Sequence, residues 1–189
     1  MRIISGEARG RKLFAPQGLN TRPTADRVKE SVFNILGRRV VEARVLDLFA
    51  GSGAMALECI SRGADFAALV DQDRGAAAVI EKNIALLRCA ERTLLINMDW
   101  RRALKQMRGY RFSLVFMDPP YKMVESYDQA AQALKEDGLL EDDATLVMEH
   151  SREVSLEGRL GQGFEIFDKR VYGESAVSFV RRTEEEDHE

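Results

Sequence analysis

From residue 44 onward, short apolar runs alternate with segments whose apolar residues recur every three or four positions. The runs are nearly continuous, as in strands buried on both faces of a parallel sheet. The segments between them have the spacing of one helix face. The sequence therefore predicts an α/β fold with strand–helix alternation. The expected strands are 44–49, 66–71, 93–97, 112–118 and 144–150, and the expected helices are 54–63, 74–88, 99–108 and 125–136.

The first 40 residues follow a different pattern, which predicts a small hairpin-plus-helix extension. Residues 2–4 and 11–14 can pair as a short hairpin around two glycines. Thr24 can cap the helix that follows, and Gly37 can end it. The apolar residues of this helix recur at i, i+4, i+7 and i+8, which places them on one face; they are Val28, Val32, Ile35 and Leu36.

The end of the chain returns to strand patterns. Residues 164–172 and 175–182 are expected to form an antiparallel hairpin at the sheet edge. The last residues are almost all acidic, which indicates a disordered tail. We therefore divide the chain into the extension, an α/β domain and the tail, with the boundaries 1–40, 41–182 and 183–189.

Charge separates the extension from the rest of the molecule. Residues 1–39 hold nine Lys or Arg and three acidic residues, a net charge of +6, which leaves −9 for the remainder of a chain whose total is −3. A basic arm on an acidic body is typical of a protein that binds a polyanion such as nucleic acid. A solvated basic surface is the alternative, and charge alone does not decide between them.

Composition narrows the remaining classes of protein. The chain has 189 residues, 45% hydrophobic and 31% charged, as expected for one globular domain. It has no apolar run of about 18 residues, so no membrane span is expected, and the N-terminus lacks a signal-peptide pattern. Cys59 and Cys89 fall in helix-like segments and are expected to be buried thiols, which favours a reducing, cytoplasmic location. No spacing of metal ligands is found, so no metal is expected.

Acidic residues occur at or just past the ends of four expected strands. They are Asp47, Asp71, Asp99 and Asp118. In an open α/β sheet, ligands bind beyond the carboxyl ends of the strands. Because a core strand does not need a carboxylate at its end, the repetition predicts a ligand site at this edge.

The first of these strands runs into a glycine-rich loop, AGSG. Gly51 and Gly53 let a ligand approach the backbone closely, and Asp71, 18 residues later, can accept hydrogen bonds from a ribose diol. A tight turn would explain the glycines but not Asp71. Asp47 stands four residues before Gly51, where it would repel a pyrophosphate. It suits a cationic ligand, which favours S-adenosylmethionine over a dinucleotide.

Two neighbouring acids have alternative interpretations. Asp99 can accept from the adenine amine or cap the helix that follows it. Asp71 and Asp73 are both plausible ribose partners; we choose Asp71, because it stands directly at the strand end, and expect Asp73 to be a helix cap. Trp100 could pack on the purine, although a core position is the simpler expectation.

A second motif, MDPPY, ends the strand 112–118. The Asp118 carboxylate and the Pro119 carbonyl can both accept from an exocyclic amine, Pro120 stiffens the turn, and Tyr121 can stack on a flat base. Fixing the amine with two acceptors could direct its lone pair toward an electrophile. A strand-ending turn with an incidental tyrosine is the alternative.

Together these stretches resemble a known family. The successive motifs DLFAGSGAMALE, VDQD, NMDW and DPPY resemble those of Rossmann-like class I S-adenosylmethionine methyltransferases. RIISGEARGRKL and TRPTADRVKESVFNIL extend the resemblance, over about residues 1–182, to the RsmD family, bacterial guanine-N2 methyltransferases of 16S ribosomal RNA. The resemblance implies a seven-stranded, mostly parallel sheet of order 3-2-1-4-5-7-6, with helices on both faces and an antiparallel last hairpin.

The resemblance also implies roles for particular residues. Gly51 and Gly53 would border the methionine part of S-adenosylmethionine, Asp71 would hold its ribose and Asp99 its adenine, and Asp47 and Ala50 would also bind this cofactor. The turn from Asp118 to Tyr121 would hold the target amine. The RNA-facing residues would be Arg9, Arg11, Lys12, Arg22, Thr24 and Arg27.

The small RNA-facing surface indicates a substrate already shaped by ribosomal proteins, an assembled or partly assembled small subunit. We expect a monomer that binds no membrane. Three other functions remain as alternatives: an adenine-N6 methyltransferase of nucleic acid, a non-catalytic RNA-binding assembly factor, and a nicotinamide oxidoreductase.

Overall fold

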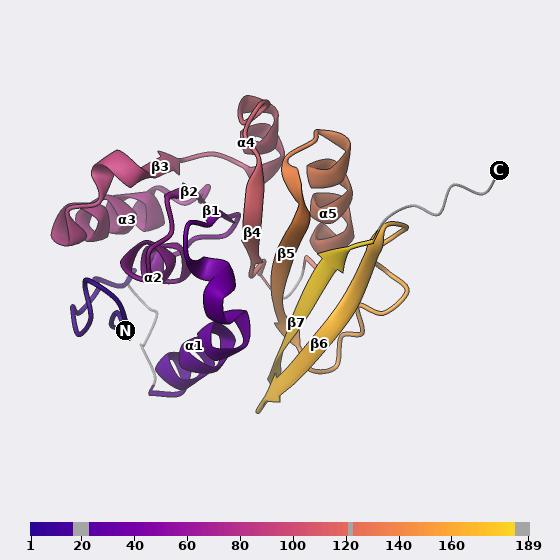
Figure 1. Cartoon of the computed structure of the whole chain (residues 1–189), viewed down its shortest axis with the longest axis horizontal. Coiled ribbons are helices and arrows are strands. Elements are labelled where there is room, and N and C mark those ends of the chain that lie inside the picture. Colours follow the sequence, from indigo (N-terminus) through magenta and orange to yellow (C-terminus); the bar gives the residue numbers. More distant parts are fainter. Residues whose placement is uncertain (17–22, 121–122, 184–189) are drawn as a thin grey trace.

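The computed structural model describes residues 1–16, 23–120 and 123–183, and within them it contains one seven-stranded sheet (Figure 1). The strand order is β3-β2-β1-β4-β5-β7-β6, which confirms the predicted order. Strands β1 to β5 are parallel, and β7 is antiparallel to both of its neighbours. The strands are β1 (Arg44–Asp47), β2 (Phe66–Val70), β3 (Thr93–Ile96), β4 (Phe112–Met117), β5 (Leu140–Ser151), β6 (Phe164–Tyr172) and β7 (Ser175–Arg182).

Helices cover both faces of this sheet, as predicted. Alternate strand residues enter different core clusters: Val45 and Phe116 pack with α1, α2 and α3, whereas Leu46 and Met117 pack with α4 and α5. We call these the first and second faces of the sheet. The helices are α1 (Pro23–Leu36), α2 (Ala54–Ser61), α3 (Arg74–Leu87), α4 (Trp100–Gln106) and α5 (Ser126–Glu136), with 3₁₀ turns η1 (Gly37–Val40) and η2 (Ala90–Arg92).

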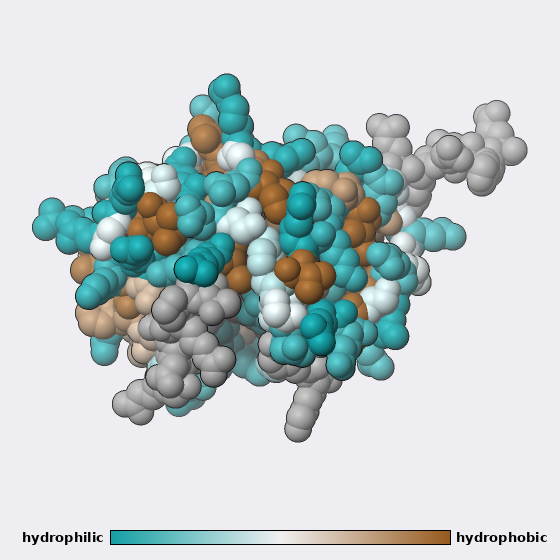
Figure 2. Space-filling view, turned by 90° about the horizontal axis from the view of Figure 1, so that it is seen from below, coloured by the Kyte–Doolittle hydropathy of each residue, from teal (hydrophilic) through white to brown (hydrophobic). Residues whose placement is uncertain are grey.

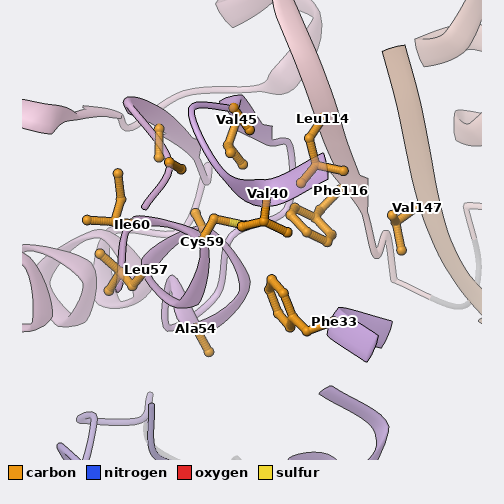
Figure 3. Packing of buried hydrophobic residues seen from close by; sticks show 14 of the residues in the cluster. Phe33, Val40, Val45, Ala54, Leu57, Cys59, Ile60, Leu114, Phe116 and Val147 are labelled. Carbon is orange, nitrogen blue, oxygen red and sulfur yellow. The ribbon is translucent and has the colours of Figure 1, made fainter. Parts of the chain in front are cut away.

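Helix α1 lies near the carboxyl ends of the strands, at the lower edge in Figure 1. Figure 3 shows Phe33 of α1 pointing toward Phe116 of β4, and the two ring centroids are 6.2 Å apart. Phe33 is almost completely buried. Burying a side chain of this size contributes about 1.5–3 kcal/mol, so this contact helps to hold α1 on the first face.

The N-terminal hairpin forms as predicted but is short. A single antiparallel bridge joins Arg2 and Lys12, and the Ile3 N–H donates to the Arg11 carbonyl at 2.9 Å. Ile3 and Leu13 are buried in the same core cluster as α1 and α2. The hairpin is therefore packed against the α/β domain.

Two buried polar side chains tie the extension to that domain. Glu58 of α2 accepts from the Ile4 and Ser5 N–H groups at 2.8 and 3.0 Å. Asn83 of α3 bonds to both the N–H and the carbonyl of Phe14, at 2.8 and 3.0 Å, and donates to the Ser52 carbonyl at 2.8 Å. Asn83 thus links the extension to the glycine loop.

Some predicted boundaries were wrong. Helix α1 begins at Pro23, so Thr24 lies inside the helix and not ahead of it as a cap; proline suits the first helical position because its missing N–H needs no partner there. Arg22 lies outside the described residues. Strand β5 begins at Leu140, before the predicted 144–150, because its polar first residues conceal the strand pattern.

The predicted end of α1 and the two predicted buried thiols agree with the structure. Gly37 follows the last residue of α1 and adopts a positive φ of 53°. Cys59 and Cys89 are free thiols in the core, as predicted. Within the described ranges, no helix is both long and apolar enough to cross a bilayer.

Candidate functional site

A cavity of about 430 Å³ opens at the carboxyl ends of the strands. It lies between part of the extension and the sheet. Four parts of the chain line it: the extension, the loop after β1, the ends of β4 and β5, and the β6–β7 hairpin. Its walls include Met1, Val28, Lys29 and Val32; Asp47, Ala50, Gly51 and Ser52; Asp118 and Glu149; and Tyr172, Ser175 and Val177. The structure therefore brings Asp47, Ala50, Gly51 and Asp118 together, as the sequence predicted.

A second cavity, of about 520 Å³, lies at the opposite ends of the strands. Its lining includes Arg39, Glu141 and Arg182, and none of the residues that we predicted for the site. Ligands of open α/β sheets bind at the carboxyl ends of the strands. We therefore assign the candidate site to the cavity of about 430 Å³, although it is the smaller one.

The loop after β1 needs both of its glycines, for different reasons. Gly53 precedes α2 with a φ of 78°, and a Cβ there would lie 2.9 Å from Leu69 Cδ2. Gly51 has a φ of 57°, but a Cβ there would meet no described atom within 4 Å. Because Gly51 lines the cavity, the space beside it is open to a ligand.

Asp47 is buried beside this loop, with only 4% of its surface exposed. The pKa of Asp47 is raised to about 7, chiefly by burial and also by the charge of Asp71, while hydrogen bonds from the backbone N–H groups of Phe49 and Ala56 oppose the shift. A carboxyl in this state would be stabilised in its ionised form by a cation in the cavity. The site therefore fits a positively charged ligand.

The acids after β2 and β3 lie outside the cavity lining. Asp71 accepts from the Gly51 N–H at 2.8 Å and from the Asp73 N–H at 2.9 Å, so it supports the glycine loop. Asp73 caps α3 by accepting from the Ala76 N–H at 2.7 Å, as predicted. Asp99 caps α4 by accepting from the Arg101 N–H at 2.9 Å. This is the helix-cap alternative. Because Asp99 Oδ2 also accepts from Arg101 Nη1 at 3.3 Å, one lone pair remains available on each carboxylate oxygen.

Trp100, which follows Asp99, is a core residue. It packs with α4 and α5 in the second core cluster and is 4% exposed. The expected core position is therefore confirmed.

The turn after β4 presents Asp118 to the cavity. Burial raises the pKa of the Asp118 carboxyl, and the charges of Glu149 and Asp47 raise it further. Asp118 itself keeps an exposed surface, because it faces the open cavity, and the water that reaches it limits the shift. Pro119 is buried and Pro120 exposed. Tyr121 lies outside the described residues, so its stacking role stays a prediction.

Sequence reasoning missed Glu149, which lines the cavity at the end of β5. Burial raises the pKa of its carboxyl. The signal was present, because Glu149 lies near the end of the expected strand 144–150. The rule that selected the four aspartates would have selected it as well.

Lys29 of α1 was also missed. We had counted it among the charges of the basic arm, but it is 3% exposed and lines the cavity. Its Nζ lies 3.2 Å from Glu58 Oε2. Burial lowers the pKa of Lys29, and the charge of Glu58 opposes this shift. A sequence gives no sign that one lysine of a basic segment turns inward.

The other basic residues of the extension have different positions. Arg9, Arg11, Lys12 and Arg27 are exposed. They belong to the same extension whose Met1, Ala15 and Pro16 line the cavity. Figure 2, the view from below in Figure 1, shows hydrophilic side chains separating smaller hydrophobic patches on this side of the molecule.

The described residues contain no group of three or more His, Cys, Asp or Glu that could hold a metal ion.

Comparison with known proteins gives consistent matches. A family model described as "conserved hypothetical protein 95" matches residues 1–181. The chain is 38% identical to the putative rRNA methyltransferase YlbH of Bacillus subtilis, over 96% of this chain and 99% of that protein. It is 36% identical to ribosomal RNA small subunit methyltransferase D of Escherichia coli K12, over 96% and 90% of the two chains.

Solved structures resemble the whole chain as well. The structure of the putative methyltransferase yhhF from Escherichia coli superposes with a TM-score of 0.83 at 35% identity, covering 96% of this chain and 97% of that one. The putative methylase HI0767 from Haemophilus influenzae gives a TM-score of 0.80 at 30% identity, covering 97% and 98%.

Proposed function

Because the chain belongs to the RsmD family, whose model is described as conserved hypothetical protein 95, we propose that it is an S-adenosylmethionine-dependent rRNA methyltransferase. We further propose that it methylates the exocyclic N2 amine of a guanine in 16S rRNA. One observation carries the proposal: the glycine loop after β1 and the acidic turn after β4 line the same cavity at the strand ends.

The chain's own residues fit the methyl donor. When bound, S-adenosylmethionine supplies a methyl group on a cationic sulfur. Asp47 would compensate its positive charge, and the open space beside Gly51 would admit its methionine part. Asp71 and Asp99 lie outside this cavity, so the adenosine would extend over the ends of β2 and β3, where their remaining lone pairs can accept from ribose and adenine.

The turn after β4 would hold the target amine. The Asp118 carboxylate and the Pro119 carbonyl would accept from its two N–H groups and so orient the nitrogen lone pair. Because the pKa of Asp118 is raised, this carboxyl is suited to take a proton released by the amine near neutral pH. Tyr121 would stack on the base.

The exposed cations of the extension would place the RNA. Phosphate contacts fix position, whereas the base in the cavity gives identity. Arg9, Arg11, Lys12 and Arg27 offer few such contacts, so we propose that the substrate is a small-subunit particle in the cytoplasm and that the protein acts on it as a monomer. Equal or faster methyl transfer to naked 16S rRNA than to particles would rule out the particle requirement.

Two measurements test the function itself. Calorimetry should detect S-adenosylmethionine binding and no NADH binding; the reverse would favour an oxidoreductase, and no binding of either would favour a non-catalytic assembly factor. Mass spectrometry of rRNA nucleosides, from particles incubated with donor and protein, should show N2-methylguanine. N6-methyladenine would instead support the adenine alternative.

A further inference from the structure

The ends of β4, β5 and β7 present a common surface to the cavity. Met117 pairs with Met148 in the parallel ladder, so the next residues, Asp118 and Glu149, are neighbours. Side chains two apart along a strand point to the same face. Accordingly Phe116 with Asp118, Val147 with Glu149, and Ser175 with Val177 all line this one cavity. Two carboxyls therefore stand side by side above an apolar floor.

The backbone that carries Glu149 is held by two contacts on the second face of the sheet, opposite the face that Glu149 shares with Asp118. The Tyr127 hydroxyl of α5 donates to the Glu149 carbonyl. The next residue, His150, is buried, and its Nε2 shares a hydrogen bond of 2.8 Å with the Ser178 hydroxyl of β7. The direction of the Glu149 side chain is thus set by the fold.

The Glu149 carboxyl is oriented but unused. In the described part of the chain it forms no ion pair and no side-chain hydrogen bond. Lys29 lines the same cavity, but its ammonium is engaged by Glu58 and by the Arg2 carbonyl. Burial raises the pKa of both Asp118 and Glu149. A raised pKa is expected for a buried carboxyl that accepts no hydrogen bond from a donor.

We propose that Glu149 selects the base: it accepts the N1–H of the target guanine while Asp118 accepts from the adjacent N2 amine. This rests on the proposed function and names a residue that determines its substrate. The N1–N2 edge of guanine presents only donors, which matches a pair of carboxylates. The corresponding edge of adenine presents N1 as an acceptor, and its lone pair would face the Glu149 carboxylate.

The experiment combines a change in the protein with a change in the base. Small-subunit particles are assembled on 16S RNA that carries guanine or 2-aminopurine at the nucleotide that mass spectrometry identifies as methylated. 2-Aminopurine keeps the N2 amine but has an acceptor at N1. Methyl transfer is measured for the wild type, for Glu149→Gln, and for a control, Glu153→Gln, at an exposed acid nearby. Calorimetry gives the affinity of each protein for S-adenosylmethionine.

The proposal predicts a specific pattern. The wild type and the control should favour guanine over 2-aminopurine in kcat/KM by about 10- to 100-fold, the size of one good base contact. Glu149→Gln should lose about the same factor on guanine but methylate 2-aminopurine faster than the wild type does, because its amide N–H can donate to N1. Its donor affinity should stay within about threefold.

Each other outcome counts against the proposal. Unchanged turnover on guanine by Glu149→Gln would overturn it. An equal loss on both bases would also overturn it, since a merely structural role predicts that result. If the wild type itself methylated neither particle, the proposed function would fail, and this pattern is distinct from a failure confined to Glu149.

Discussion

At the residue scale, the acids at the strand ends differ because their surroundings differ. Asp73 and Asp99 accept from backbone N–H groups at helix starts, and Asp71 supports Gly51. Asp47 and Asp118 instead face the cavity, and burial raises the pKa of each. These five aspartates therefore occupy two kinds of position, and only the cavity-facing kind is suited to charge or proton chemistry.

Replacing Asp118 with Ala should abolish methyl transfer. The change removes an acceptor for the target amine but leaves the glycine loop intact. Donor affinity should therefore stay within about tenfold, since the lost interaction belongs to the reaction and not to donor binding. Single-turnover kinetics and calorimetry measure the two quantities. Asp128→Ala on the neighbouring helix α5 serves as a matched control, and near-normal turnover in Asp118→Ala would mean that the catalytic assignment is wrong.

Donor binding should depend on pH through Asp47. Its pKa is about 7 in the free protein. A cationic donor favours the ionised carboxyl and so lowers this pKa, which means that binding releases a proton below pH 7. Affinity should therefore rise with pH by up to about tenfold per unit below pH 7 and level off above it.

Calorimetry from pH 5.5 to 8.5 in buffers of different ionisation enthalpy measures both the affinity and the proton released. Asp118, whose pKa is also raised, interacts electrostatically with Asp47 and would contribute to the slope. Asp47→Asn is therefore the control, and it should bind more weakly and without this slope. A slope that persisted in Asp47→Asn would assign the titration to another group.

At the element scale, the two glycines of the β1–α2 loop have different roles: Gly53 allows close packing, and Gly51 leaves space for a ligand. Gly53→Ala should mainly destabilise the fold, because its Cβ would approach Leu69 at a positive φ. Gly51→Ala carries similar backbone strain, but its methyl group would occupy the open space in the cavity. It should therefore weaken donor binding by about tenfold or more, beyond its effect on stability.

Thermal unfolding and donor calorimetry on both glycine variants test this difference. The prediction requires that the larger loss of melting temperature belongs to Gly53→Ala and the larger loss of donor affinity, measured well below either melting temperature, to Gly51→Ala. If the order were reversed, Gly51 would not border the donor.

The contact between the extension and α2 depends on Glu58. Its carboxylate is fully buried, pairs with Lys29 and Arg62, and accepts from two backbone N–H groups. Glu58→Gln would leave Lys29 buried without its anion and should lower the free energy of unfolding by about 3–5 kcal/mol. Urea unfolding measures the loss. Glu81→Gln, at an exposed acid on α3, should change stability by about 0.5 kcal/mol or less.

Helices and strands could be predicted where their buried residues form a regular apolar pattern along the sequence. The continuous apolar runs gave the strands, and the last two, 164–172 and 175–182, match β6 and β7 residue for residue. Strand β5 was placed too late because the residues after its first, Glu141, Asp142 and Asp143, are polar. Asn83 and Glu58 could not be recognised, because a polar residue in a helix has the same local sequence whether it faces solvent or a buried backbone.

At the scale of the whole molecule, the extension completes the cavity. Helix α1 supplies one wall, and the β6–β7 hairpin supplies another. The two walls meet where Ser31 Oγ and Tyr172 Oη share a hydrogen bond of 2.5 Å. Residues 31 and 172 lie at opposite ends of the chain, so this closure follows from the topology and not from any local pattern. The extension therefore contributes to the site as well as carrying exposed charge.

That exposed charge gives the last prediction. If Arg9, Arg11 and Lys12 each contact one phosphate, replacing all three with neutral residues should weaken RNA binding. It should also reduce the slope of log K against log salt by about 2, since each contact to single-stranded RNA contributes about 0.7.

The control removes the same charge from the second face of the sheet, at the exposed residues Arg102, Lys105 and Arg108. Both variants are titrated with 16S RNA fragments from 50 to 200 mM KCl. A general effect of net charge would change both slopes alike, whereas an RNA-binding extension changes only the first. An unchanged slope in the first variant would place the RNA surface elsewhere on the molecule.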